Sequence, residues 1–219
     1  IPSSLKDNTD MQILHASLLV SAGRGKEAAE IGNALQKKNP SNMEVLELNA
    51  EIASANGDKS GKKAILSQIL AVDPYNAAAN IQQAQDFAVN HKYKLACNSY
   101  KKALKNSPDN PDALFGFGQM SYYLNNIKDA SDSFQKILDK NPDNAMALAY
   151  MGKLAAEDEN YLRATKYVEQ AIQQDDSNYD FYMDLGTYKR YQGKYDEAEK
   201  AWTKAISLDP TYFLAYAYR

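Results

Sequence analysis

The sequence has few of the side chains on which metal binding and thiol chemistry depend. It contains one cysteine, Cys97, and two histidines, His15 and His91, which lie far apart in its 219 residues. A zinc site needs a cluster of such ligands, and an internal disulfide needs a second cysteine. We therefore expect no metal, no cofactor and no internal disulfide. Cys97 is expected to be a small packed side chain, with His15 on a packed helix face and His91 in a turn.

Long apolar runs and an excess of basic charge are also missing. The chain has 25 Lys and Arg against 28 Asp and Glu. Apolar stretches such as Leu18-Leu19-Val20 are far shorter than the roughly 20 residues of a bilayer span. Proteins that bind nucleic-acid backbones usually have a basic surplus on one face. The composition predicts a soluble chain without membrane insertion or nucleic-acid binding, and it leaves the cytoplasm and the bacterial periplasm open as compartments.

Sequence motifs for catalysis are weak. Gly23-Arg24-Gly25-Lys26 resembles part of a phosphate-binding loop, but Val20 replaces the leading glycine and Glu27 replaces the Ser or Thr after the lysine. The stretch 57–63 lacks the leading glycine as well, because Asn56 stands in its place. We interpret both as turns and expect no enzyme activity. Because no Met precedes Ile1, we expect the sequence to be part of a longer protein.

Proline and asparagine recur along the chain every 34 residues, with one vacancy in the proline series at Asp176. The prolines are Pro40, Pro74, Pro108, Pro142 and Pro210, and the asparagines are Asn8, Asn42, Asn76, Asn110, Asn144 and Asn178. The asparagine side chain caps helix N-termini, and proline cannot continue a preceding helix. Each proline and asparagine together therefore mark the end of one helix and the start of the next.

This spacing predicts six units, at 9–42, 43–76, 77–110, 111–144, 145–178 and 179–212. We number the positions of each unit as slots, starting with the residue after the asparagine. Slot eight holds Ala or Gly in every unit, and slot twenty holds Ala in all but the second, which has Lys62. Small side chains at these slots let two helices approach closely. Residues 1–8 are expected to be a lead-in or the end of a preceding repeat, and 213–219 the start of a truncated seventh.

The repeat resembles that of the tetratricopeptide repeat family. Its last unit matches the family pattern best, through Tyr182, Leu185, Gly186, Gly193, Tyr195, Ala198, Trp202, Ala205 and Pro210. The resemblance covers residues 9–212 and implies an all-α, right-handed α-solenoid of stacked helix-turn-helix repeats. The second unit departs from the pattern with Asn49, Lys59 and Lys62 in core slots, so we expect an offset second helix or loose packing there.

The resemblance also implies a concave surface that holds peptides or partner helices. On the first helix of each unit, slots two, five, six, nine, twelve and thirteen point away from the expected packed stripe, and we call the surface they form the inner wall. The inner wall is acidic in the early units and rich in aromatic residues and Met in the later ones. The candidate partner-binding residues are Glu44, Glu47, Glu51, Gln82, Gln85, Phe115, Gln119, Tyr122, Tyr123, Tyr150, Lys153, Met183, Arg190 and Tyr191.

These residues predict a scaffold that binds an extended peptide or a partner helix of another protein. Many family members bind chaperone tails through a carboxylate clamp, but no run of three units here supplies the required Lys and Asn. The alternatives are an accessory domain of a larger enzyme or of a secretion or assembly complex, and a self-assembly module that associates through the aromatic end, 213–219. RNA binding is least favoured, because the first three units have no Lys or Arg on the inner wall.

Overall fold

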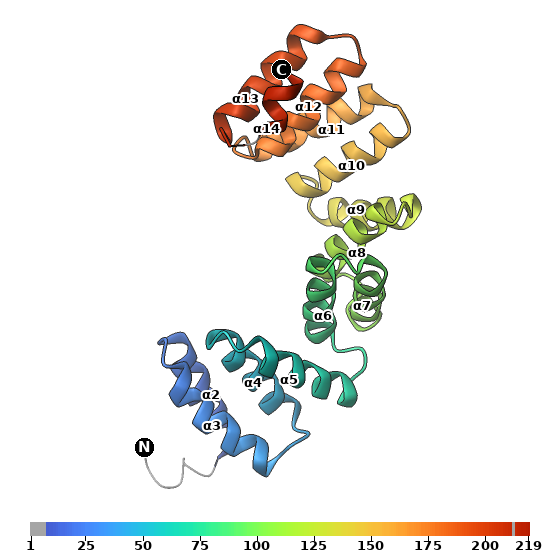
Figure 1. Cartoon of the computed structure of the whole chain (residues 1–219). Coiled ribbons are helices and arrows are strands. Elements are labelled where there is room, and N and C mark those ends of the chain that lie inside the picture. The colour runs from blue at the N-terminus through green and yellow to red at the C-terminus, as the bar shows by residue number, and fades with distance from the viewer. Residues whose placement is uncertain (1–7, 212) are drawn as a thin grey trace.

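The structure is a computed structural model that describes residues 8–211 and 213–219, and this part of the chain is helical without strands (Figure 1). The helices are α2 (Thr9–Ser21), α3 (Gly25–Lys38), α4 (Met43–Ala55), α5 (Lys59–Val72), α6 (Ala77–Val89), α7 (Tyr93–Asn106), α8 (Pro111–Tyr123), α9 (Ile127–Lys140), α10 (Ala145–Glu157), α11 (Tyr161–Gln174), α12 (Tyr179–Tyr191), α13 (Tyr195–Leu208) and α14 (Phe213–Tyr218). Consecutive pairs from α2–α3 to α12–α13 form hairpins, which we number as repeats 1 to 6. The predicted all-α solenoid is confirmed. Of the predicted lead-in, residues 1–7 lie outside the described residues.

Asparagine side chains begin the first helix of every repeat. Asn42 accepts a hydrogen bond from Val45 N at 3.0 Å, and Asn144 accepts one from Ala147 N at 2.9 Å. The other asparagines that act in this way are Asn8, Asn76, Asn110 and Asn178. The turn inside each hairpin contains one residue with a positive φ, which is His91 in repeat 3 and Gly193 in repeat 6. The same local signals therefore set both ends of each hairpin.

Small side chains allow the two helices of each repeat to pack closely. The slot-twenty alanines of five repeats are almost completely buried, namely Ala28, Ala96, Ala130, Ala164 and Ala198. At slot eight of repeat 6, a Cβ added to Gly186 would lie 2.3 Å from Trp202 Nε1. The Trp202 ring thus packs directly on the backbone of α12, and its Nε1 donates to the Met183 carbonyl at 3.3 Å. Cys97 lies in the core as expected, and burial raises the pKa of its thiol.

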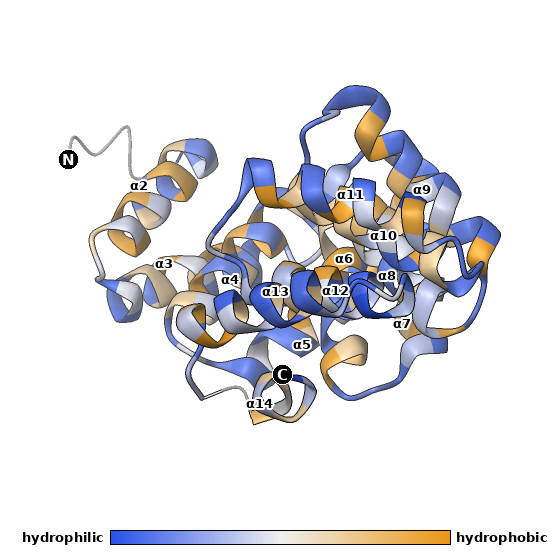
Figure 2. Ribbon diagram, turned by 90° about the horizontal axis from the view of Figure 1, so that it is seen from above, coloured by the Kyte–Doolittle hydropathy of each residue, from blue (hydrophilic) through white to orange (hydrophobic). Residues whose placement is uncertain are grey.

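Two features of the N-terminal helix differ from a fully packed one. His15 is exposed, so its predicted place on the packed face of α2 is wrong, and that face is formed instead by Ala16 and Leu19. Leu14 and Leu18 are exposed as well, and Figure 2 shows α2 as mostly hydrophobic along its visible side. This helix has no repeat before it among the described residues, so its outer face lacks the cover that the first helices of later repeats receive.

The joint between repeats 1 and 2 accommodates a polar residue in a core slot. Asn49 is buried, and its Nδ2 donates to the Gly32 carbonyl at 3.2 Å and to Gln36 Oε1 at 2.9 Å. A Cβ at Gly32 would lie 2.1 Å from Asn49 Oδ1, so the missing side chain of Gly32 makes room for the amide. Asn49 is therefore compatible with regular packing, because both of its neighbours are adapted to it.

The joint between repeats 2 and 3 is open. Lys62 occupies the slot that holds a buried alanine elsewhere, and its Nζ reaches across to Gln82 Oε1 on α6. In Figure 1, α5 and α6 point in clearly different directions where the chain passes from one to the other. Val89, near the end of α6, is 80% exposed. A lysine side chain cannot be buried at the close approach of two helices without great cost, and Lys62 accordingly stays half-buried with its amine directed toward α6.

A side-chain hydrogen bond links the turn ends of two pairs of neighbouring repeats. Asn56 Nδ2 donates to the Gly25 carbonyl at 3.0 Å, and Gln192 Nε2 donates to the Tyr161 carbonyl at 3.0 Å, so the same slots join repeat 2 to repeat 1 and repeat 6 to repeat 5. The equivalent residue of repeat 3, Asn90, donates instead to Asp86 within its own helix. The expected irregularity of the second repeat is thus an opening on the side that faces the third.

One matched pair of substitutions tests this difference between joints. Ala164→Leu should lower the free energy of unfolding by about 1–3 kcal/mol, because Ala164 is fully buried where α10 and α11 approach closely. Lys62→Leu places the same side chain in the same slot beside the open joint, where the native side chain is only half-buried, and we expect a change below about 0.5 kcal/mol. Urea denaturation followed by circular dichroism measures both. Similar losses for the two variants would contradict the open joint.

Candidate functional site

A cavity of about 220 Å³ lies across the first helices of repeats 4, 5 and 6. Its lining residues are Tyr122 and Tyr123 of α8, Met146, Ala149, Tyr150 and Lys153 of α10, and Asn178, Asp180, Phe181 and Asp184 at the start of α12. Most of these residues occupy the slots assigned to the inner wall. The stacking of repeats therefore places side chains that are about 30 residues apart in sequence around one depression.

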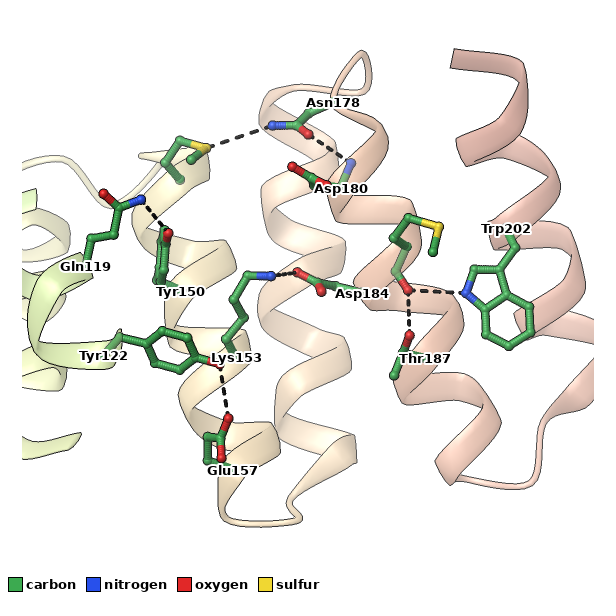
Figure 3. A network of polar contacts seen from close by, with 12 residues as sticks. Gln119, Tyr122, Tyr150, Lys153, Glu157, Asn178, Asp180, Asp184, Thr187 and Trp202 are labelled. Carbon is green, nitrogen blue, oxygen red and sulfur yellow. Dashed lines mark hydrogen bonds and ion pairs between the residues drawn. The ribbon is translucent and has the colours of Figure 1, made fainter. Parts of the chain in front are cut away.

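Polar contacts cross this surface from one repeat to the next (Figure 3). Gln119 Nε2 donates to Tyr150 Oη at 2.7 Å, and the Tyr122 hydroxyl donates to Glu157 Oε1 at 3.0 Å. Lys153 Nζ then lies 2.7 Å from Asp184 Oδ2. Each contact joins the first helices of adjacent repeats, so the three contacts hold α8, α10 and α12 at fixed distances along the inner wall.

Aromatic rings form a connected chain beside the polar contacts. Tyr150 stacks on Phe134 with ring centroids 4.8 Å apart, and it meets the edges of Phe115 and Tyr122. Tyr122 in turn neighbours Tyr123. Only Tyr123 of these five residues is strongly exposed, at 50%. The chain therefore has a rigid buried part and one end that is open to a binding partner.

Burial changes the acidity of the groups on this surface. Burial, together with the hydrogen bond to Glu157, raises the pKa of Tyr122 to about 12. Burial also raises the pKa of Tyr150 and of the Asp184 carboxyl, and in the second case Lys153 acts in the opposite direction. The two tyrosines stay protonated at neutral pH, so their hydroxyls remain available as hydrogen-bond donors.

The structure places two of the predicted inner-wall residues inside the solenoid. Tyr150 is 6% exposed and Met183 is 7% exposed, so the expectation that they project away from the core is wrong for both. Tyr150 occupies slot six, and this slot faces slot twenty-four of the preceding repeat, where Phe134 stands. The same pairing holds between Gly116 and Tyr100, since a Cβ at Gly116 would lie 2.1 Å from the Tyr100 ring. Slot six is therefore part of the joint between repeats.

Met183 is buried for a different reason. It packs in the cluster that contains Ala198, Trp202 and Ala215, and its carbonyl accepts the hydrogen bond from Trp202. The residue helps to join α12 to α13 and to α14. Its role is consequently packing, although its slot was assigned to the inner wall.

The other predicted residues fall into three places. Tyr122, Tyr123 and Lys153 line the cavity, and Gln119 and Phe115 contact the lining residue Tyr150. At the turn end of α12, Tyr191 stacks on Tyr161 at 4.6 Å and Arg190 lies beside it. The residues at the early repeats are Glu44, Glu47, Glu51, Gln82 and Gln85, and three of them, Glu47, Glu51 and Gln82, line a separate cavity at the open joint.

The sequence analysis missed Asp184, Phe181 and the pair Asn178 and Asp180, which complete the cavity on the α12 side. Asp184 occupies slot six of repeat 6 and Asp180 occupies slot two, so both slots had already been assigned to the inner wall. Applying the inner-wall slots to repeat 6 in the same way as to the other repeats would have identified Asp180 and Asp184 from the sequence. Asn178 was recognised only as a helix cap, and its Nδ2 also contacts Met146 Sδ at 3.9 Å.

Within residues 8–211 and 213–219, no group of three or more His, Cys, Asp or Glu side chains is arranged to hold a metal ion. Nor does any helix there combine the length and the apolar character needed to cross a membrane.

Comparisons with known proteins agree with the repeat architecture. Two family models described as tetratricopeptide repeat match residues 118–180 and 179–212. The chain is a tetratricopeptide repeat protein. A search of curated proteins by sequence finds no match. Proteins built of tetratricopeptide repeats generally serve in protein interactions. The inner wall is therefore the candidate interaction surface.

Solved structures show the same fold at low sequence identity. PilF of Pseudomonas aeruginosa has a TM-score of 0.75 and 16% identity, over 98% of this chain and 97% of that one. YrrB, described as a TPR protein with an unusual peptide-binding site, has a TM-score of 0.70 and 21% identity, over 85% of this chain and 96% of that one. MamA has a TM-score of 0.65 and 19% identity, over 77% and 92%. At such identities the likeness shows the tetratricopeptide fold alone.

The pair formed by Lys153 and Asp184 gives a pH-dependent prediction. Because the native pKa of Asp184 is raised above its ordinary value of 3.8, the native state binds this proton more tightly than the unfolded state does. The stability of the wild type relative to Asp184→Asn should therefore be highest below pH 3.8 and fall as the pH rises through the raised native pKa. Urea denaturation of both proteins over that range measures the difference. A carboxyl carbon titration by NMR with a native pKa at or below 3.8 would contradict the prediction.

Proposed function

We propose that the inner wall of repeats 4 to 6 binds an extended peptide or a helix of a partner protein. The observation on which this proposal rests is the cavity across α8, α10 and α12, which is bordered by exposed Tyr123 and Met146. Tyrosine and methionine offer large contact area at small entropic cost and are frequent at binding hot spots. The tetratricopeptide fold and the peptide-binding site named for YrrB support this function.

The groups around the cavity define how a partner would be held. Tyr123 and Met146 would cover apolar side chains of the partner, while Lys153, about 30% exposed, would meet a carboxylate or a carbonyl oxygen. On the opposite side, Asp180 would accept hydrogen bonds from partner N–H groups. The fixed contacts Gln119–Tyr150 and Tyr122–Glu157 hold these groups in place before binding, which lowers the entropic cost of association. We assign no reaction to this surface, and we propose that the chain is not an enzyme.

Self-assembly is a second candidate, and exposed apolar side chains on α2 and α14 favour it. Phe213 and Tyr216 of α14 are exposed, and so are Leu14 and Leu18 of α2. Apolar groups at both ends of a repeat stack could join one copy to the next in a head-to-tail manner. Sedimentation over a series of concentrations tests this candidate, since a constant mass at all concentrations would exclude it. An accessory role within a larger enzyme or assembly complex is compatible with either mode of binding.

Two substitutions at the cavity test the peptide-binding function. Peptides are first selected on the wild-type protein from a random display library, and their affinities are measured by calorimetry. The double variant Tyr123→Ala and Met146→Ala should weaken binding at least about tenfold, which corresponds to about 1.4 kcal/mol. Both side chains are exposed, so the core stays intact, whereas Tyr150→Ala would remove a packed ring from the joint.

The matched control is Leu162→Ala on α11. Leu162 is exposed to a similar degree but does not line the cavity, so its loss should leave the affinity unchanged. Selected peptides whose affinity does not respond to the double variant, or responds equally to Leu162→Ala, would refute the proposed surface.

A further inference from the structure

We propose that the open joint between repeats 2 and 3 is a second binding site, and that it takes an aliphatic side chain flanked by Lys or Arg in a peptide. The joint contains a cavity of about 360 Å³. Its lining residues are Glu47, Ala50, Glu51 and Ser54 of α4, Lys62, Leu66 and Ile69 of α5, and Asn76, Ala78, Ala79 and Gln82 at the start of α6. None of these residues lines the cavity of repeats 4 to 6.

Three features distinguish this joint from the others. Lys62 replaces the slot-twenty alanine. Asn80 occupies slot four, where repeats 4 to 6 have Leu or Tyr, and its Nδ2 donates to the Pro74 and Asn76 carbonyls at 3.1 and 2.8 Å. Ala50, at slot eight, is only half-buried, whereas the Ala or Gly at slot eight of every other repeat is buried. The joint therefore has polar side chains at two slots where repeats 4 to 6 have apolar ones, and the slot-eight alanine beside it stays half-buried.

The floor of the cavity is apolar, and its residues Leu66, Ile69 and Ala79 are themselves largely buried. Leu66, Ile69 and Ala79 form a small cluster with Leu46, and Ala50 packs against its edge. A volume of about 360 Å³ is at the lower end of the range for ligand sites and suits one or two side chains rather than a whole helix. An aliphatic or small aromatic side chain of a peptide would cover the surface that α6 leaves open.

The rim determines the charge of the partner. Glu44, Glu47 and Glu51 follow one another along one face of α4, and all three are exposed. No ion pair joins them to another of the described residues, and the nearest polar contact is a weak one from Asn76 Nδ2 to Glu47 Oε1 at 3.4 Å. Lys62, the one cationic residue of the lining, is engaged with Gln82.

This arrangement favours a basic peptide over other partners. Glu47 and Glu51, which line the cavity without an ion pair, complement a Leu, Ile or Val with a neighbouring Lys or Arg, and Glu44 adds a third exposed carboxylate on the same helix. An acidic peptide would be repelled by the same carboxylates, and a nucleic acid would be repelled through its phosphates. This inference rests on the proposed function of the inner wall. It adds a second binding site, at the joint between repeats 2 and 3, and that site would bind a basic peptide.

The experiment is an NMR titration of the ¹⁵N-labelled protein with three synthetic peptides of equal length in a Gly-Ser frame. The first has a central Leu flanked by Lys, the second a central Leu flanked by Glu, and the third a central Ala flanked by Lys. We expect the first peptide to shift the amide signals of Ala50, Ala78 and Gln82 in a saturable manner. It should bind at least about tenfold more tightly than the other two, as expected for combined charge and apolar recognition.

Two variants and one matched control assign the binding to the cavity. Glu47→Gln with Glu51→Gln removes two rim charges, and Ala50→Leu fills the cavity from the α4 side, so each should weaken binding of the Lys-Leu-Lys peptide at least about fivefold. Glu30→Gln removes an exposed charge on α3, outside the cavity, and should leave binding unchanged. If Ala50→Leu does not fold, the double variant Glu47→Gln and Glu51→Gln still tests the proposal.

The outcomes separate this site from the one in repeats 4 to 6. Shifts confined to Ala50, Ala78, Gln82 and their neighbours support the proposal even if the Tyr123 and Met146 variant shows no effect on selected peptides. Shifts at Tyr123 and Lys153 instead, equal binding of the Glu-flanked peptide, or affinity unchanged by both variants would overturn it, and so would the absence of any saturable shift at millimolar peptide.

Discussion

The close approach of helices at slots eight and twenty is the constraint on which the rest of the structure depends. At these slots a small residue lets two backbones meet, as Ala164 and Gly152 do within repeat 5, where a Cβ on the glycine would lie 3.2 Å from the Ala164 carbonyl oxygen. A large ring such as Trp202 can then cover the backbone from the side. Because each repeat touches only its neighbours, the whole solenoid is a sum of such joints.

A change in one joint therefore stays local. Lys62 and Asn80 open the stack between repeats 2 and 3, yet the helices on either side keep their caps and their own cores. A globular protein with a single core would have to distribute such a disturbance over many contacts. In a solenoid the same disturbance becomes a cavity with a defined place, and the acidic face of α4 borders it.

The sequence was sufficient for the fold and for only part of the site. The asparagine caps and the small slots repeat with a fixed period, so the helices and their pairing could be predicted from local signals. The exposure of each side chain could not be predicted in this way, because it depends on which side chains of the preceding repeat lie against it. Slot six holds Tyr150 against Phe134 and Gly116 against Tyr100, so one slot can be filled by a ring or left empty according to its neighbour.

The two surfaces of the inner wall differ in how they hold their charges, and this difference sets their selectivity. Around the cavity of repeats 4 to 6, Lys153 is paired with Asp184 and Glu157 accepts from Tyr122, so the wall presents a fixed shape with little free charge. The glutamates of α4 are exposed and unpaired with other described residues, and their attraction for cations is screened over about 10 Å at 0.1 M salt. Recognition at repeats 4 to 6 should therefore depend mainly on shape and respond less to salt, whereas recognition at the open joint should weaken strongly as the salt concentration rises. Because the joints are independent, a single extended partner could satisfy both conditions with different segments.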